Sequence, residues 1–519
     1  MTTPYTIGIE LGSTRIKTVL IAPDASVISQ GAYSWKSTLQ DGLWTYDLDE
    51  VWQGLQSAVA QLRQGFHEKT GQALTEVAAI GISAMMHGYL AFDAADHLLV
   101  PFRTWQNTNT AEAADELTDL FRFNIPKRWS VAHYYQAVLN CEAHVPQVAW
   151  LTTLAGYVHY RLTGRRVLGI GDASGMFPIE GNTYSSRMLD SFNERLAARG
   201  IGQDFGALLP EILLAGDEAG ALTEEGAHLL DPTGGLRPGC PLCPPEGDAG
   251  TGMIATNSIA PRTANVSAGT SAFLMAVLEH PLAGVYREID MVTTPTGAPV
   301  AMIHVNNFTA EINAWAALFA EVVTLGGGQI EQSELFDRLY HAALNADTDC
   351  GGLVGYNFQA GEPIANIAAG APLLMRRPDG RLTLPNLMKM HIYSALGTLT
   401  LGMEILRREA VQLDAVCGHG GFFKAGAVST SAMSAAIGVP VTLIRNAGEG
   451  GAWGVALLAL MTARAEHDAG RFLAWIFDSA EKTTTMADDQ EQQAFRSFMA
   501  DYRRGLAVER MASAAIYGW

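Results

Sequence analysis

The chain has 519 residues, of which 48% are hydrophobic and 17% charged, and its formal net charge is −19. A chain of this length exceeds what one compact core accommodates, so we expect two domains. The acidic balance repels nucleic acid and anionic lipid, which argues against a nucleic-acid-binding or membrane-surface protein.

The cysteines and the lack of long apolar runs bear on the cellular compartment in which the protein is expected. The five cysteines are an odd number spread over a long chain, which is typical of a reducing environment rather than of a disulfide framework. The first residues lack the basic and apolar regions of a signal peptide, and no run of about 18 apolar residues suggests a membrane span. We therefore expect a cytoplasmic protein.

The first part of the chain predicts a strand–turn–strand unit followed by mixed helices and strands. The expected elements are strands at 5–9 and 19–22, a helix at 47–66 with Asp47 as N-cap and Glu50 completing a capping box, a strand from Val77 to Ser83, and a helix from Thr152 to Leu162 ending at Gly164.

The turn of the first hairpin, within Glu10 to Lys17, is a candidate phosphate site. Gly12, Ser13 and Thr14 can direct several backbone N–H groups into one concavity, and we include Lys17 in this site. The carboxylate of Glu10 can hold Mg²⁺ through water. An ordinary hairpin turn would have the same composition, so this segment alone leaves both interpretations open.

A candidate sugar-binding wall follows in the segments SAMMHGYLAFD and VPFRTWQNT. They combine apolar side chains with hydrogen-bond donors and acceptors, the mixture that a polyol needs. A lone histidine after a strand is more often structural than functional, so a structural role stays open for His87. The candidate residues are Met86, His87, Arg103, Trp105 and Asn107.

The strand–turn–strand pattern recurs later in the chain. A Pro- and Gly-rich connection at 231–247 precedes expected strands from Thr263 to Ser267 and from Ala272 to Leu278. Helical patterns then dominate from Glu311 to Asn345 and from Leu387 to Glu409, and the last fifty residues predict polar helices. The repeat predicts two related halves, which we place at residues 1–257 and 258–519.

Three further segments can carry chemistry. Asp248, in a Gly-rich setting, can act as a general base at the top of a helix, or serve only as a helix N-cap. The second hairpin turn repeats the phosphate-binding composition of the first. GHGGFF allows close approach of a flat ligand, and the segment from Glu449 to Gly454 is expected to open a further helix. The small residues in both segments also suit close helix packing. The candidates are Gly269, Thr270 and Ser271 in the turn, and Gly420, Gly421 and Phe422 after it.

These segments, in this order, resemble the FGGY family of carbohydrate kinases over almost the whole chain. The family's first phosphate loop matches Glu10 to Thr14, its next tryptophan-containing segment Gly42 to Trp52, its Met-His pair Met86 and His87, and its R-x-W-x-N segment Arg103 to Asn107. Its Gly-Asp segment matches Gly247 and Asp248, its second phosphate loop Gly269 to Ser271, its adenosine segment Gly420 and Gly421, and its late small-residue helix Gly451 to Leu457.

The resemblance implies an α/β fold of two actin/hexokinase/Hsp70-like (ribonuclease H-like) domains that flank a catalytic cleft. It also implies ATP and Mg²⁺ as cofactors, with Glu10 and Asp248 at the metal, Asp248 as the base, and a small sugar as substrate. D-xylulose is the first candidate, and ribulose, another ketopentose, a tetrulose or a polyol remain open. A homodimer is expected by analogy alone.

Two residues depart from the family pattern. Glu10 stands where the family has Asp, which moves the carboxylate that would hold the metal. Ala249 stands where xylulokinases place a side-chain amide, and ribulokinase-like members are more similar there. Two other functions also remain open on this fold, an ATP or polyphosphate hydrolase and a non-catalytic sugar-sensing protein.

Overall fold

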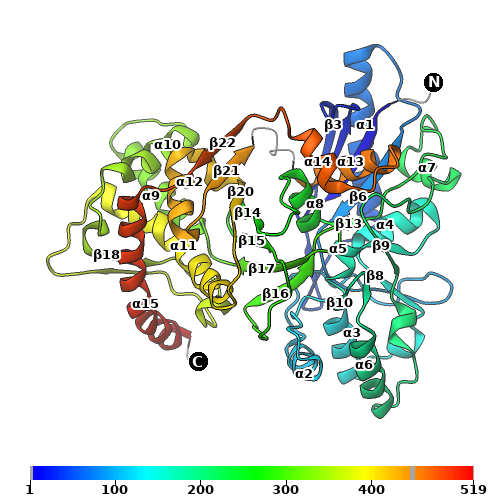
Figure 1. The fold of residues 1–519 in the computed structure, drawn as a ribbon, viewed down its shortest axis with the longest axis horizontal. Coiled ribbons are helices and arrows are strands. Elements are labelled where there is room, and N and C mark those ends of the chain that lie inside the picture. The colour runs from blue at the N-terminus through cyan, green and yellow to red at the C-terminus, as the bar shows by residue number, and fades with distance from the viewer. Residues whose placement is uncertain (1–3, 445–449, 518–519) are drawn as a thin grey trace.

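The computed structural model describes residues 4–444 and 450–517, which form two halves, each built on its own central sheet (Figure 1). The blue and cyan N-terminal half carries the N-terminus, and the elements α10, α11, α12 and α15, coloured yellow-green to red, lie at the other end of the molecule with the C-terminus. Within these residues, no helix combines the length and apolarity needed to cross a bilayer.

The first sheet has the strand order β13-β6-β1-β2-β3. β1, β2 and β3 form an antiparallel meander, and β6 and β13 add in parallel on the other side of β1. Five of the six residues of β1 are buried, because helices cover both faces of the sheet. The strands are β1 Thr6–Leu11, β2 Arg15–Ile21, β3 Val27–Ser34, β6 Ala79–Ala84 and β13 Glu246–Gly247.

The second sheet repeats this order in β17-β15-β14-β20-β21, with the same parallel and antiparallel pairings, and adds β16 and β22 at its edges. The strands are β14 Thr263–Ala268, β15 Ala272–Val277, β16 Ile289–Thr293, β17 Pro299–Val305, β20 Ala415–His419, β21 Val441–Ile444 and β22 Lys482–Thr485. The predicted repeat and the two-domain fold class are confirmed. β22 was not predicted, because its residues KTTT are largely exposed and give no apolar alternation.

Helices and short strand pairs complete the two halves. The helices are α1 Leu48–Thr70, α2 Ala111–Phe121, α3 Ser130–Leu139, α4 Leu154–Thr163, α5 Ile170–Ala173, α6 Ser186–Ala198, α7 Glu224–Leu230, α8 Asp248–Ala255, α9 Ala310–Leu325, α10 Gln332–Ala342, α11 Leu384–Arg408, α12 Ala427–Ile437, α13 Gly450–Ala463, α14 Ala469–Ile476 and α15 Asp489–Tyr517. The strand pairs are β4 Thr38–Gln40 with β5 Leu43–Thr45, β7 Leu90–Phe92 with β8 Trp150–Thr152, β9 Val167–Gly169 with β12 Glu211–Leu213, β10 Ile179–Glu180 with β11 Thr183–Tyr184, and β18 Leu353–Tyr356 with β19 Leu373–Arg376.

The predicted cap of α1 is confirmed in part. The side chain of Asp47 accepts a hydrogen bond from the N–H of Asp49, which satisfies one free donor of the first turn. Glu50 does not complete the box. Its carboxylate accepts instead from the hydroxyl of Tyr33 on β3, at 3.4 Å.

Helix α13 joins the two halves. It follows the second sheet in sequence, yet it packs against the first sheet and against α8, and Figure 1 shows it in orange beside the blue strands. A Cβ built on Gly8 of β1 would lie 2.0 Å from the backbone oxygen of Ala452. The sheet and the helix are therefore in backbone contact. The predicted start of this helix, Glu449, lies outside the described residues, and the division at 257/258 remains a proposal.

Candidate active site

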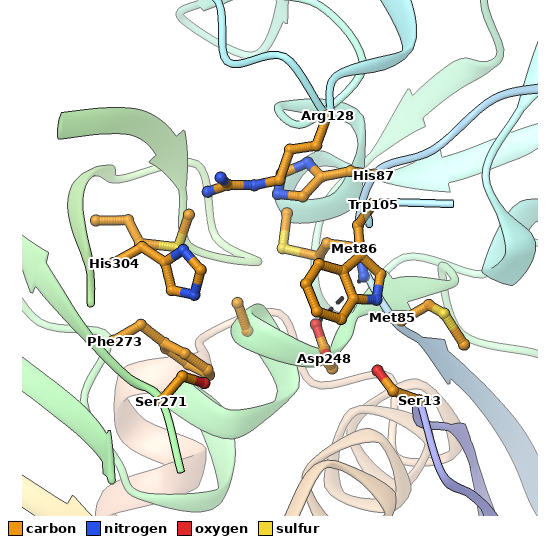
Figure 2. A pocket seen from close by; sticks show the side chains of 12 residues that line it. Ser13, Met85, Met86, His87, Trp105, Arg128, Asp248, Ser271, Phe273 and His304 are labelled. Carbon is orange, nitrogen blue, oxygen red and sulfur yellow. Dashed lines mark hydrogen bonds between the residues drawn. The ribbon is translucent and has the colours of Figure 1, made fainter. Parts of the chain in front are cut away.

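A cavity of about 210 Å³ lies between the two halves (Figure 2). The first half contributes residues from the first hairpin turn, from the segment after β6 and from the start of α8. The second half contributes residues from the second hairpin turn and from β15 and β17. The lining residues are Ser13, Met85, Met86, His87, Trp105, Arg128, Asp248, Ala249, Ser271, Phe273, Met302 and His304.

Asp248 is the first residue of α8 and follows directly on β13. Its Oδ1 accepts a hydrogen bond of 3.3 Å from the backbone N–H of Met86, the dashed line in Figure 2. This contact ties the carboxylate to the segment after the neighbouring strand β6. Since one carboxylate oxygen is so held, the group has a fixed position at the cavity wall.

The surroundings of Asp248 make it a stronger base than an ordinary aspartate. Burial, with the nearby Glu10 carboxylate as the second cause, raises the pKa of Asp248 to about 7. The hydrogen bond from Met86 acts in the opposite direction but is the smaller effect. A carboxylate with a pKa near neutrality suits proton abstraction from a hydroxyl group.

The first glycine of each hairpin turn is hydrogen-bonded within its turn, although the turns differ in length: Leu11 pairs with Ile16 across the first and Ala268 with Ala272 across the second. The N–H of Gly12 donates to the carbonyl of Arg15 at 2.9 Å, and the N–H of Gly269 donates to the carbonyl of Ser271 at 2.9 Å. These two glycine amides are therefore engaged within their turns, and the predicted donors to a phosphate are left to the other residues of each turn.

The other amides of the two turns remain available. Neighbouring groups bind the carbonyl oxygens: the hydroxyl of Tyr46 donates to Ser13, and the backbone N–H of Phe308 donates to Thr270. Among the described residues, the N–H groups of Ser13 and Thr14, and of Thr270 and Ser271, have no acceptor. Each turn thus presents two adjacent N–H groups, an arrangement that binds anions.

A second cavity, of about 630 Å³, lies within the second half beside the second hairpin turn. Four of the predicted nucleotide-site residues line it: Gly269, Thr270, Gly421 and Phe422. Sequence reasoning missed the rest of this lining, at the start of α9, on α10 and in the segment after Gly421, because these mostly polar residues form no motif. They are Thr309, Asn313, Gln332, Ser333, Phe336, Asp337, Tyr340, Lys424 and Ala425.

Gly420 supports this second cavity without lining it. Its φ is 103°, and a Cβ at this position would lie 2.4 Å from the carbonyl oxygen of Ala268, at the end of β14. A side chain is excluded on both grounds. The chain therefore passes close under the second hairpin turn, and this approach places Gly421 and Phe422 at the cavity.

The predicted sugar wall divides into two groups. Met86, His87 and Trp105 line the cavity between the halves. Arg103 and Asn107 do not. Arg103 forms an ion pair with Glu142, and Asn107 exchanges hydrogen bonds of 2.8 Å with the backbone of Trp44. Both are buried and engaged elsewhere, so the structure gives no support for the direct sugar contact predicted for them.

Sequence reasoning missed five residues of the cavity, which are Met85, Arg128, Phe273, Met302 and His304. Arg128 lies in the loop before α3, where no motif marks it. Phe273 on β15 and His304 on β17 are direct cross-strand partners, and Met302 lies two residues before His304 on the same face. The alternation of side chains along a strand predicts that Met302 and His304 share one face of the sheet. The sequence alone does not show that this face lies against the first half of the molecule.

Glu10 and Lys17 lie in a separate recess of about 380 Å³ with Gly12, Thr14 and Arg15. Burial raises the pKa of Glu10, while Lys17 and the backbone N–H of Ala452 act to lower it. A Cβ on Gly451 would lie 2.5 Å from the Glu10 Oε1. The carboxylate therefore lies against the first turn of α13, which only glycine permits at this distance.

The carboxylates of Glu10 and Asp248 are the candidate metal ligands. Their proximity raises the pKa of Asp248, and a divalent cation would relieve this repulsion. In the described part of the chain, no group of three or more His, Cys, Asp or Glu residues could hold a metal. The donor set fits Mg²⁺, which keeps several waters and binds through one or two carboxylates together with substrate phosphates.

Two further carboxyl groups lie behind Asp248. Glu246 accepts hydrogen bonds from the backbone N–H groups of Gly171 and Asp172, at 3.2 and 2.9 Å. Asp172 accepts from the hydroxyl of Thr153 at 2.6 Å, and its Oδ1 has no partner. Both side chains are 1% exposed. Burial raises the pKa of Asp172 to about 7 and that of Glu246 to about 8.

Replacement of Asp172 by asparagine is expected to flatten the pH dependence of stability. A folded-state pKa above the unfolded value means that the folded protein binds the proton more tightly. The stabilisation is thus complete below the unfolded pKa and is lost as pH rises through about 7. Urea unfolding between about pH 5 and about pH 8 should show a smaller loss of stability in Asp172→Asn than in the native protein. Equal losses would contradict the assignment.

Family models match two consecutive parts of the chain. The N-terminal domain of the FGGY family of carbohydrate kinases matches residues 5–254, and its C-terminal domain matches residues 264–463.

Curated relatives are similar at low identity. The xylulose kinase of Escherichia coli (strain K12) is 24% identical over 291 residues, which are 53% of this chain and 54% of that protein. The xylulose kinase of Staphylococcus xylosus is 22% identical over 242 residues, 44% of this chain and 46% of that protein. The gluconokinase of Bacillus subtilis (strain 168) is 22% identical over 303 residues, which are 54% of this chain and 53% of that protein. The chain thus spans about half the length of these relatives.

Solved structures share the fold over nearly the whole chain. Gluconate kinase from Lactobacillus acidophilus has a TM-score of 0.81 at 18% identity and covers 99% of both chains. Ligand-bound xylulose kinase from the same organism has a TM-score of 0.79 at 17% identity, again over 99% of both chains. Plasmodium falciparum glycerol kinase with ADP has a TM-score of 0.75 at 12% identity over 98% of both chains. At these identities the likeness shows a common fold.

Proposed function

Because the chain belongs to the FGGY family of carbohydrate kinases, we propose that it transfers the γ-phosphoryl group of ATP to a hydroxyl group of a small sugar. One observation carries the proposal: a carboxylate with a raised pKa, Asp248, lies in a cavity lined by both hairpin turns. A ketopentose such as D-xylulose is the first candidate substrate. Ribulose, a tetrulose or a polyol are the alternatives.

Asp248 accepts the proton of the attacking hydroxyl group. Phosphoryl transfer depends on in-line positioning and on stabilisation of charge at the transferred group, so the protein needs one well-placed base rather than covalent chemistry. The hydrogen bond from Met86 holds the Oδ1 of Asp248 at the wall of the cavity. A terminal hydroxyl group of the sugar would therefore meet a base of fixed position.

The nucleotide would occupy the larger cavity and extend its phosphates toward Asp248. Gly421 and Phe422 line this cavity, and Lys424 adds a positive charge to the same lining. Thr270 lines this cavity, whereas the next residue, Ser271, lines the sugar cavity. The second hairpin turn thus connects the two cavities, and its free amides would donate to the phosphates.

The first hairpin turn would bind the transferred phosphoryl group from the other side. Ser13 lines the sugar cavity, and its amide and that of Thr14 are free to donate. Mg²⁺, when bound by Glu10 and Asp248 through water, would neutralise charge on the phosphates. Closure of the two halves would exclude water, which competes with the sugar as acceptor.

The choice of a ketopentose rests on the similarity to xylulose kinases and on the cavity size. A volume of about 210 Å³ suits a small acceptor. Ala249 lines this cavity in place of the side-chain amide expected for xylulokinases, which keeps ribulose among the candidates.

An ADP-release assay tests the proposal. ATP and Mg²⁺ would be supplied with a panel of ketopentoses, aldoses, tetruloses, aldonates and polyols, with Asp248→Ala as the blank. We expect strong stimulation by one class of sugar and none in the blank. Sugar-independent ADP release would favour an ATP hydrolase instead. No ADP release with any sugar, and none after Glu10→Asp, would favour a non-catalytic sugar-binding protein.

A further inference from the structure

We propose that Arg128 selects the sugar by its oxidation state: its guanidinium group donates to a keto or carboxylate oxygen at the end of the substrate away from the reacting hydroxyl group. This inference rests on the proposed kinase function and concerns the same cavity. The chemistry common to both acceptors is an oxygen atom without a hydrogen.

Arg128 is held in place at the cavity by two anchors. Its backbone carbonyl accepts a hydrogen bond of 3.1 Å from the N–H of Gly88, next to His87. Its guanidinium group forms an ion pair with Asp290 on β16, in the second half of the chain. Asn124 donates to the other oxygen of Asp290 at 3.2 Å. The backbone of Arg128 is therefore held from the first half and its guanidinium group from the second.

The guanidinium group of Arg128 lines the cavity and has donors that Asp290 does not use. A guanidinium group has five N–H donors, and Asp290 is the one acceptor with which the Arg128 side chain is hydrogen-bonded among the described residues. Figure 2 shows Arg128 with His87 on one side of the group of lining residues and Asp248 with Ser13 on the other. A sugar with its reacting hydroxyl at Asp248 would extend its other end toward Arg128.

The ion pair favours an acceptor oxygen without adding a net charge. Arg128 and Asp290 together are neutral, so a neutral keto oxygen can accept a hydrogen bond without leaving a buried charge unpaired. A carboxylate would accept a stronger, charge-assisted bond from the same group, in competition with Asp290. The keto oxygen and the carboxylate oxygen both carry no hydrogen, and the guanidinium group cannot accept a hydrogen bond. The two acceptors therefore match a group that only donates.

The two histidines would serve the neighbouring hydroxyl groups. Burial lowers the pKa of both His87 and His304, which therefore remain neutral. The Nδ1 of His87 lies 3.4 Å from the carbonyl of Gly175 and must carry the hydrogen, which leaves Nε2 as an acceptor. The imidazole of His304 has no hydrogen-bond partner in the described part of the chain, although its backbone belongs to β17. Each imidazole can accept from one hydroxyl group.

An alditol fits this set less well than a ketose. Its additional hydroxyl group would bring one more hydrogen to this lining, where the two imidazole acceptors already serve the neighbouring hydroxyl groups and where Arg128, Met86 and Met302 are not good acceptors. An unsatisfied polar hydrogen in such a place costs enough to lower kcat/KM by roughly tenfold or more.

The test compares three oxidation states of one carbon skeleton. We would measure kcat/KM with D-xylulose, with xylitol and D-arabinitol, which are its reduction products at the keto carbon, and with D-xylonate, and repeat the series for D-ribulose. We expect the ketose, or the aldonate, to exceed the alditols by about tenfold or more. In Arg128→Met, the ratio of kcat/KM for the preferred substrate to kcat/KM for the alditols should fall to within about threefold of one. The ratio is independent of the fraction of folded enzyme.

A matched control separates selection from closure of the two halves. Arg287 also forms an ion pair across the halves, with Asp115, but it is exposed and does not line the cavity. Arg287→Met should keep the native ratio. Equal use of alditol and ketose by the native enzyme, or an unchanged ratio in Arg128→Met, or the same collapse in Arg287→Met, would overturn the inference while the kinase function stands. Absence of any sugar-dependent ADP release would overturn both.

Discussion

Asp248→Asn is expected to lower kcat by about 10²- to 10⁴-fold, the range in which general-base catalysis contributes. The asparagine oxygen can still accept the hydrogen bond from the N–H of Met86, so the geometry at the start of α8 should persist. The amide cannot take the proton of the sugar hydroxyl at neutral pH. The measurement is kcat at saturating ATP and sugar, together with the thermal unfolding midpoint, which should not fall.

The pH profile gives a second readout for the same residue. Because burial and Glu10 raise the pKa of Asp248 to about 7, the active carboxylate form is lost as pH falls below that value. The native kcat/KM should therefore rise with pH through about 7, and the residual activity of Asp248→Asn should lack this step.

Asp172→Asn provides the matched control for this prediction. It makes the same chemical change at a buried carboxyl group that does not line the cavity, and kcat should stay within about threefold of the native value. Near-normal turnover in Asp248→Asn, or an equal loss in Asp172→Asn, would remove Asp248 from the role of base.

Gly454→Ala is expected to destabilise the protein by about 3 kcal/mol or more, the upper range for overpacking. A Cβ at this position would lie 2.0 Å from the backbone oxygen of Thr251 on α8. Backbone cannot move aside as a flexible side chain can, so α13 and α8 must separate. Thr251 is also hydrogen-bonded to Ser83 at 3.0 Å, which links the damage to the strand beside Asp248. Urea unfolding measures the loss.

Gly252→Ala on the opposing helix α8 is the control. No atom lies within 4 Å of a Cβ built there, and replacing a helical glycine by alanine stabilises a helix by up to about 1 kcal/mol. The two glycine-to-alanine changes should thus have opposite signs. A neutral Gly454→Ala would show that the two helices are not in backbone contact.

The sequence by itself determined the features that depend on local chemistry. Each hairpin is recognisable because an apolar run, a turn of Gly, Ser and Thr, and a second run follow one another in a short segment. The recurrence of this unit predicted two related halves, and the order of the short motifs predicted the family correctly. Asp248 could be placed at the start of a helix because an aspartate before small residues is a local signal.

Only the tertiary structure decided which side chains meet across the cleft. A motif marks Arg103 and none marks Arg128, yet an ion pair with Glu142 engages the first, while the second lines the cavity and pairs with Asp290. Likewise, the small residues of α13 suit many helix contacts, and the structure shows that they meet the first sheet. The physical reason is the same in both cases: ion pairs and backbone contacts between residues far apart in the chain depend on how the halves pack, and no local pattern in the sequence records that packing.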